Sequence, residues 1–160
     1  MMNKKTRFLT QSALIAALYV ALTFVSAVMG MASGAIQLRL SEALTILPVF
    51  TPAAVPGLFI GCLAANLLTG AAIWDIIFGS IATLLGALGT YYFGKNRYLA
   101  VMFPILSNSV IVPFVLKMAY GVSDGYLFLF LTVFLGEVIS CGIFGLILRS
   151  SLEKTKIFIK

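Results

Sequence analysis

The strongest constraint on the fold is a succession of long apolar runs with few charges between them. Residues 8–35, for example, contain no Asp, Glu, Lys or Arg. The 160-residue chain is 61% hydrophobic and 10% charged, whereas soluble domains average about 45–50% apolar and about 25% charged residues. The runs approach the roughly 20 residues that a membrane-spanning helix needs, and they lack the alternation of barrel strands. The sequence therefore predicts an all-α integral membrane protein with one transmembrane domain over residues 1–160.

Six segments are candidates for crossing the bilayer, and the second of them is weak. They are approximately residues 10–29, 36–50, 53–68, 73–93, 99–118 and 126–148. A helix over 36–50 would be only about 22 Å long, against a hydrocarbon core of about 30 Å. This segment also contains Pro48. Because irregular backbone at membrane depth needs protein partners, we expect it to pack inside the bundle and not against lipid.

The positions of the basic residues decide between five and six crossings. Lys and Arg gather at the N-terminus, at Lys95 and Arg97, and in the C-terminal tail from Arg149 onward. Cytoplasmic loops are enriched in Lys and Arg. With six crossings all three groups are cytoplasmic, whereas with five crossings the last two groups are outside. We therefore predict a six-helix bundle with a short second helix and with both termini in the cytoplasm.

In this topology the polar residues inside the spans lie at mid-depth or toward the outer side. An ionised side chain inside a membrane costs about 2.5–3.5 kcal/mol even on lenient scales, so such residues are functional candidates. The candidates for binding a substrate are Glu137, Asp75, Trp74, Asn66, Asn108, Glu42, Arg39 and Gln37. Glu137 is the strongest of them, because no basic residue lies within eleven positions of it.

Structural roles are open for the other candidates. Arg39 and Glu42 are three residues apart, so on a helix they would share a face and pair with each other. Trp74 and Asp75 fall near the membrane interface, where tryptophan and solvated carboxylates are common. The two asparagines would also serve to join neighbouring helices by hydrogen bonds.

The charges buried in the spans do not balance. Three carboxylates, those of Glu42, Asp75 and Glu137, face one guanidinium, that of Arg39. A cavity with this excess prefers a ligand that carries positive charge or donates hydrogen bonds, and Trp74 offers a flat surface for a ring. The chain has no histidine, which removes the commonest metal ligand and general base. Its two cysteines fall in apolar runs, as buried small hydrophobic residues do. We expect no metal, no cofactor and no nucleic acid partner.

Two further patterns bear on function. GTYYFGKN at 89–96 is close to the phosphate-binding loop of nucleotide hydrolases, but it lacks the Ser or Thr after the lysine and does not follow a strand. The chain is therefore expected to be no enzyme and to have no ATPase site of its own. Ala13, Ala17 and Ala21 recur every four residues on one face of the first span. Small residues at this spacing let helices approach closely, either within one protein or with a partner.

Part of the chain closely resembles a known family. QLRLSEALTILPVFTPAAVPGLFIGC at 37–62, the asparagine at 66 and WDIIFGS at 74–80 are similar to the queuosine-precursor transporter (QueT) family. The resemblance implies the substrate-binding subunit of an energy-coupling factor (ECF) transporter, with six helices and an outward-facing site, in a bacterial plasma membrane. It also implies a transmembrane coupling subunit and two ATPase subunits as partners, with the alanine stripe as the docking surface.

The ligand that the resemblance implies is prequeuosine, a deazaguanine with an aminomethyl cation, or a related base. The excess of carboxylates suits such a ligand, with Glu137 and either Asp75 or Glu42 holding the donor edge and the cation. Nanomolar capture of about a dozen heavy atoms needs an occluded pocket, so we expect residues 30–35 to act as a lid. The alternatives are a stand-alone facilitator, a binding subunit for another heterocyclic vitamin, and a membrane scaffold without a ligand.

Overall fold

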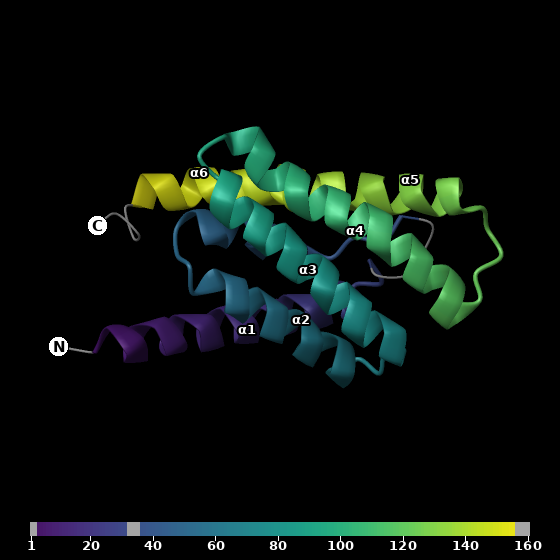
Figure 1. Cartoon of the computed structure of the whole chain (residues 1–160), viewed down its shortest axis with the longest axis horizontal. Helices are drawn as coiled ribbons and strands as arrows, with labels where there is room; N and C mark the ends of the chain where they lie inside the picture. The colour runs from purple at the N-terminus through teal and green to yellow at the C-terminus, as the bar shows by residue number, and fades with distance from the viewer. Residues whose placement is uncertain (1–2, 32–35, 156–160) are drawn as a thin grey trace.

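The computed structural model describes residues 3–31 and 36–155, and within them the chain is helical (Figure 1). Its elements are α1 (Lys4–Val28), the 3₁₀ helix η1 (Leu40–Val49), α2 (Ala54–Leu68), α3 (Ile73–Phe93), α4 (Arg97–Tyr120), α5 (Tyr126–Glu137), the π-helical segment η2 (Val138–Phe144) and α6 (Gly145–Thr155). The last three elements follow one another without a break, so together they form one continuous helix of 30 residues.

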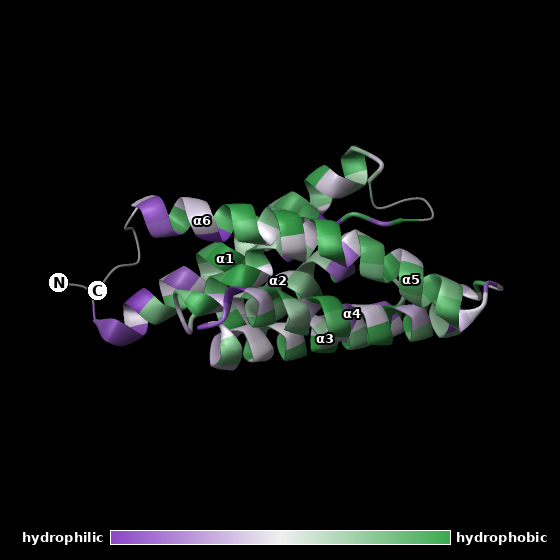
Figure 2. Cartoon of the chain, turned by 90° about the horizontal axis from the view of Figure 1, so that it is seen from above, coloured by the Kyte–Doolittle hydropathy of each residue, from purple (hydrophilic) through white to green (hydrophobic). Residues whose placement is uncertain are grey.

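Within residues 3–31 and 36–155, four helices are long and apolar enough to cross a membrane: α1, α3, α4 and the continuous α5–η2–α6 helix. The helices η1 and α2 are apolar but shorter. Hydrophobic residues cover the long sides of the helices, and hydrophilic residues gather mainly toward the two ends of the bundle (Figure 2). The chain is therefore a helical, multi-pass membrane protein. That all six segments cross the bilayer stays a prediction.

The predicted spans agree with the helices in the middle of the chain and fall short at its ends. Helix α3 has the predicted limits. Helix α1 begins at Lys4, well before residue 10, because the Asn3 side chain caps it by accepting a hydrogen bond from the Lys5 amide. Helix α6 continues past residue 148 to Thr155. Apolar runs mark the part of a helix that lies in lipid, whereas capping and backbone hydrogen bonds decide where the helix ends.

The short second segment lies at the centre of the bundle. Seven of the ten residues of η1 are buried, and η1 packs against α1, α2, α3, α4, η2 and α6. At about 2.0 Å per residue, a 3₁₀ helix of this length spans only about 20 Å, and residues 36–39 before it are not helical. The structure therefore confirms that protein encloses this segment, and it shows turns tighter than those of an α-helix.

The three groups of basic residues lie at one end of the bundle. The start of α1 and the end of α6 are at the same end in both views (Figures 1 and 2). Arg97, at the start of α4, forms an ion pair with Glu153 of α6 at 3.0 Å, and the Arg149 guanidinium donates a hydrogen bond to the Gly94 carbonyl oxygen at 3.0 Å. An even number of crossings requires such an arrangement. Which side of the membrane this end faces stays a prediction.

Glycines let α1 lie directly on α2. A Cβ atom added at Gly57 would come within 2.8 Å of the Ser12 carbonyl oxygen, and one added at Gly61 would come within 2.8 Å of the Tyr19 Cβ atom. Small residues at such positions allow close approach of two helices in a membrane protein. This contact holds Tyr19, which is 1% exposed, inside the bundle.

Candidate ligand-binding site

A small buried cavity brings together five of the eight predicted binding residues. This inner cavity has a volume of about 20 Å³. Its lining comes from the segment before η1, from η1 and from α3, α4 and α5: Gln37, Arg39, Glu42, Gly79, Thr83, Asn108, Val112, Val133 and Glu137. The predicted residues among them are Gln37, Arg39, Glu42, Asn108 and Glu137. Residues far apart in the sequence thus converge on one chamber.

Glu42 is the most buried acidic residue of the cavity, at 2% exposed. One of its carboxylate oxygens accepts a hydrogen bond from the Tyr19 hydroxyl of α1. The other accepts one from the Asn108 amide of α4 at 3.3 Å. Hydrogen bonds to a charged group are stronger than those between neutral groups, so two helices orient this carboxylate toward the cavity.

Two further hydrogen bonds join η1 to α1 beyond the bond from Tyr19. The Thr23 hydroxyl donates to the Ser41 hydroxyl at 2.9 Å, and the Leu40 amide donates to the Ser26 hydroxyl at 2.9 Å. Their α1 partners lie four and seven residues after Tyr19, so all three are on one face of α1. Helix α1 therefore determines where η1 presents Glu42.

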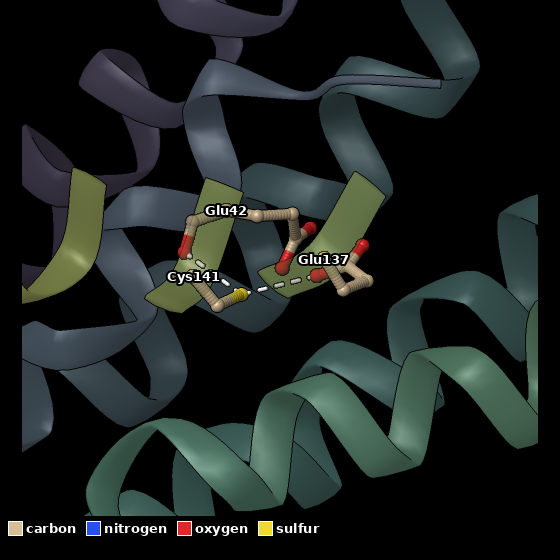
Figure 3. Close-up of side chains that lie close together, drawn as sticks. All are labelled: Glu42, Glu137 and Cys141. Atoms are coloured by element: carbon tan, nitrogen blue, oxygen red, sulfur yellow. Dashed lines mark hydrogen bonds between the residues drawn. The ribbon is translucent and has the colours of Figure 1, made fainter. Parts of the chain in front are cut away.

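Glu137 lies opposite Glu42, and Cys141 lies beside both (Figure 3). The Cys141 sulfur is 3.0 Å from a Glu137 carboxylate oxygen and 3.4 Å from the Glu42 backbone oxygen. Glu137 is 8% exposed and Cys141 is 1% exposed. Cys141 belongs to η2, and π-helical turns inside α-helices occur frequently at functional sites.

The Glu42 and Glu137 carboxylates need a positive partner. One ligand atom from each of Glu42, Glu137 and Cys141 lies within 4.8 Å of the others. Two ionised carboxylates this close repel each other, and a cation between them would relieve that repulsion. Among the residues that the structure describes, no Lys or Arg side chain forms an ion pair with either of them. The arrangement therefore favours a cation between them.

Two kinds of cation fit this group of atoms. Carboxylate oxygen and thiolate sulfur are ligands of zinc-like divalent metals, and carboxylates also accept hydrogen bonds from an ammonium group. The expectation that no metal binds stays a prediction.

Asp75 belongs to a second, larger chamber that adjoins the inner cavity. This outer chamber has a volume of about 380 Å³ and is lined by Gln37, Arg39, Asp75, Val112, Val115, Leu116, Tyr120 and Val122. Both chambers share Gln37, Arg39 and Val112. The Arg39 guanidinium lies 3.9 Å from one Asp75 carboxylate oxygen, and the Tyr120 hydroxyl donates a hydrogen bond to the same oxygen at 3.1 Å. The ion pair of Arg39 is therefore with Asp75, and the pairing with Glu42 that the sequence allowed does not form.

The other oxygen of Asp75 has no partner. Asp75 is 6% exposed, and its Oδ1 atom is buried without a hydrogen bond within the described part of the chain. A Cβ atom added at Gly79 would come within 2.9 Å of this oxygen. The carboxylate therefore lies over the bare backbone of Gly79, which is itself a wall of the inner cavity. A buried acceptor without a donor is costly, and a ligand with an N–H group would satisfy it.

The structure does not bring Asn66 or Trp74 to the lining of either chamber. The Asn66 amide donates to the Asp75 backbone oxygen at 3.2 Å, so Asn66 supports the start of α3. Trp74 is 47% exposed and stacks on Phe78, with ring centroids 5.9 Å apart. It lines a separate apolar hollow with Phe114 and Met118. Trp74 is therefore not placed to stack on a ligand in the polar chambers.

The predicted docking stripe lies in the described part of the chain, whereas most of the predicted lid does not. Ala13, Ala17 and Ala21 are all exposed on α1, so the bundle does not use them for its own packing. The predicted lid, residues 30–35, includes residues 32–35, which lie outside the described part of the chain.

Sequence reasoning missed several residues of the site. Cys141 lies four residues after Glu137, a spacing that puts both on one helix face, and this signal was available. The hydroxyl of Tyr19 in the middle of an apolar run was also visible. No sequence pattern predicted a role for Gly79 or Tyr120. Glycine is common in membrane helices, and a tyrosine near a helix end is typical of the membrane interface.

Comparisons with known proteins identify relatives of the sequence. The model of the QueT transporter family matches residues 9–154. The queuosine precursor transporter QueT of Lactococcus lactis subsp. cremoris (strain MG1363) is 33% identical over 98 residues, which cover 61% of this chain and 57% of that protein. The match thus spans just over half the length of this relative. No solved structure matches the chain. Since the family model covers nearly all of the sequence, the chain belongs to the QueT transporter family.

Proposed function

We propose that this chain is the substrate-binding subunit of an ECF-type importer and that it captures a queuosine precursor with high affinity. The observation that carries the proposal is the convergence of Gln37, Arg39, Glu42, Asn108 and Glu137 on one buried cavity. Polar residues in membrane helices are expensive and tend to mark substrate pathways. The printed name of the Lactococcus relative supplies the class of substrate.

The charge of the site supports a cationic precursor. Glu42 and Glu137 are buried close together, so the site favours a ligand with an ammonium group, as in the aminomethyl deazaguanine prequeuosine. The outer chamber, at about 380 Å³, falls in the range of about 300–1,000 Å³ that is usual for small-molecule sites.

Calorimetric titration of the purified protein with the aminomethyl deazaguanine tests this function. The wild-type protein should bind it tightly, and Glu137→Gln should lose at least about 30-fold in affinity, because one partner of a buried charge contact is removed. Glu153→Gln is the matched control, since Glu153 lies at the basic end of the bundle, is not part of the cavity lining and is exposed. Equal affinity of wild-type and Glu137→Gln proteins would remove Glu137 from the site. No binding of deazapurines by the wild type would favour a ligand-free scaffold or another vitamin.

The proposed partners are a transmembrane coupling subunit and two ATPase subunits. The exposed alanines of α1 support this part of the proposal, because small residues permit close helix contact. Ala17→Leu should retain ligand binding and lose co-purification with the coupling subunit. Ala27→Leu is the control, because Ala27 is also exposed on α1 and lies outside the stripe. Uptake that continues without ATPase subunits would indicate a stand-alone facilitator.

The proposed orientation places the basic end of the bundle in the cytoplasm of a bacterial cell, and the chambers then open outward. The shared location of Lys4, Arg97 and Arg149 at that end supports it, because basic residues favour the cytoplasmic side.

A further inference from the structure

We propose that the two chambers orient the ligand, with its ammonium group in the inner cavity between Glu42 and Glu137. A neutral N–H group of its ring then donates to Oδ1 of Asp75, a residue that lines the outer chamber. Gly79 is a positioning residue, because its missing side chain leaves room for the Asp75 carboxylate. This inference rests on the proposed function and assigns each carboxylate a different part of the ligand.

The volumes of the chambers support this orientation. The inner cavity, at about 20 Å³, exceeds the roughly 10–15 Å³ that one water molecule needs. An ammonium group is close to water in size, so it fits there, whereas a fused ring does not. The outer chamber of about 380 Å³ has room for the ring. Since the two chambers share Gln37, Arg39 and Val112, one ligand can reach both.

The charges of the two chambers also favour the ammonium group in the inner cavity. Arg39 lines both chambers, but its guanidinium forms its ion pair, at 3.9 Å, with Asp75 of the outer chamber. In the inner cavity Glu42 and Glu137 have hydrogen-bond donors from Tyr19, Asn108 and Cys141, none of which is a cation. The positive end of a ligand is therefore attracted more strongly to the inner cavity.

The hydrogen bonds of Asp75 support its role as an acceptor for a neutral donor. Its Oδ2 atom is held by the Tyr120 hydroxyl, which in turn accepts a hydrogen bond from the Ala72 amide at 3.2 Å. Its Oδ1 atom is buried over the backbone of Gly79, and no residue that the structure describes donates a hydrogen bond to it. One oxygen is thus fixed by the protein, and the second remains for the ligand.

The test compares two ligands that share a ring and differ in charge: the deazaguanine with an aminomethyl group and the same base with a nitrile group. Binding of each is measured by calorimetry, in EDTA, to the wild type and to the variants E42Q, E137Q, D75N and G79A. We expect E42Q and E137Q to lower the affinity for the amine at least about tenfold more than the affinity for the nitrile. D75N and G79A should lower both affinities by similar factors, about tenfold.

G125A is the control for the glycine substitution, because a Cβ atom at Gly125 meets nothing within 4 Å. It should bind both ligands as the wild type does. Thermal unfolding of each variant, with and without ligand, shows whether the variant is folded, and D75N tests the same contact as G79A without adding a side chain. Loss of binding by folded G125A comparable to that of G79A would overturn the role of Gly79.

Several results would overturn the orientation. One is D75N affecting only the amine while E137Q affects both ligands equally, which would place the ammonium at Asp75. Another is tighter binding of the nitrile than of the amine by the wild type. Loss of amine binding in EDTA would show that a metal ion occupies the inner cavity. Wild-type protein that binds neither ligand would instead overturn the proposed function, and the orientation with it.

Discussion

The basic end of the bundle and the inner cavity differ in how their carboxylates are paired. At the basic end, Glu153 is partly exposed and contacts two guanidinium groups, Arg97 at 3.0 Å and Arg149 at 2.7 Å. In the inner cavity, Glu42 and Glu137 are buried and, within the described part of the chain, form no ion pair with Lys or Arg. The exposed carboxylate of Glu153 thus has two guanidinium partners, although burial makes a counter-charge more important for Glu42 and Glu137.

This difference separates a structural role from a binding role. An exposed ion pair contributes little to stability, and here it joins α6 to the start of α4. A buried carboxylate without a counter-charge lowers stability, and in the proposed function a cationic ligand supplies that charge to Glu42 and Glu137. The comparison predicts that changes in the cavity alter binding, whereas changes at the basic end alter stability alone.

The largest effect is expected from placing a cation directly beside Glu42 in the inner cavity. In Asn108→Lys, an ammonium group replaces the amide that donates to Glu42 at 3.3 Å, and the cavity then resembles the basic end. Affinity for the aminomethyl base should fall by about 100-fold or more, since lysine and ligand compete for the same carboxylates. Calorimetry measures this loss. Asn108→Met, of similar length and without charge, should lose much less, and equal losses would show that size alone is responsible.

A smaller effect is expected from removing the donor that α1 provides. Tyr19→Phe deletes the hydrogen bond to Glu42, so the carboxylate is no longer held toward the cavity, and ligand affinity should fall about tenfold. Tyr126→Phe is the matched control, because its hydroxyl donates to the Val110 carbonyl oxygen at 2.7 Å and is exposed. Affinities of the two variants should differ in a titration, and equal values would contradict the role of Tyr19.

The smallest effect is expected at the basic end. Glu153→Gln removes the charge that contacts Arg97 and Arg149, and the free energy of unfolding should fall by about 1 kcal/mol or less. Ligand affinity should not change. Thermal unfolding and calorimetry on the same sample measure both quantities. A large loss of ligand affinity in Glu153→Gln would contradict the expectation that changes at the basic end alter stability alone.

Much of the fold follows from hydropathy. The limits of α3 and the enclosed position of η1 were predictable, because a lipid environment demands apolar length and leaves irregular backbone only inside protein. Glu42, Asn108 and Glu137 were predictable as site residues for a related reason. Polar groups at membrane depth are costly, so they collect where they contact one another or a ligand.

Side-chain direction was less predictable, and two residues show why. Trp74 and Asp75 are neighbours in the sequence, but successive residues on a helix point about 100° apart. Asp75 therefore faces the outer chamber while Trp74 faces an apolar hollow on the exterior. Arg39 was read as part of a helix with Glu42, yet its backbone is extended, with φ −113° and ψ 106°. It reaches Asp75 for that reason.

The sequence by itself determined a helical membrane protein, the segments that form its helices and the polar residues that need partners, because hydropathy and charge act on each residue locally. Only the tertiary structure decided that Arg39 pairs with Asp75, that Tyr19 and Asn108 hold Glu42, and that Glu42 and Glu137 share a cavity in which neither forms an ion pair within the described part of the chain. Those contacts join residues up to about a hundred positions apart. They depend on how the helices are rotated and packed against one another, which no local pattern specifies.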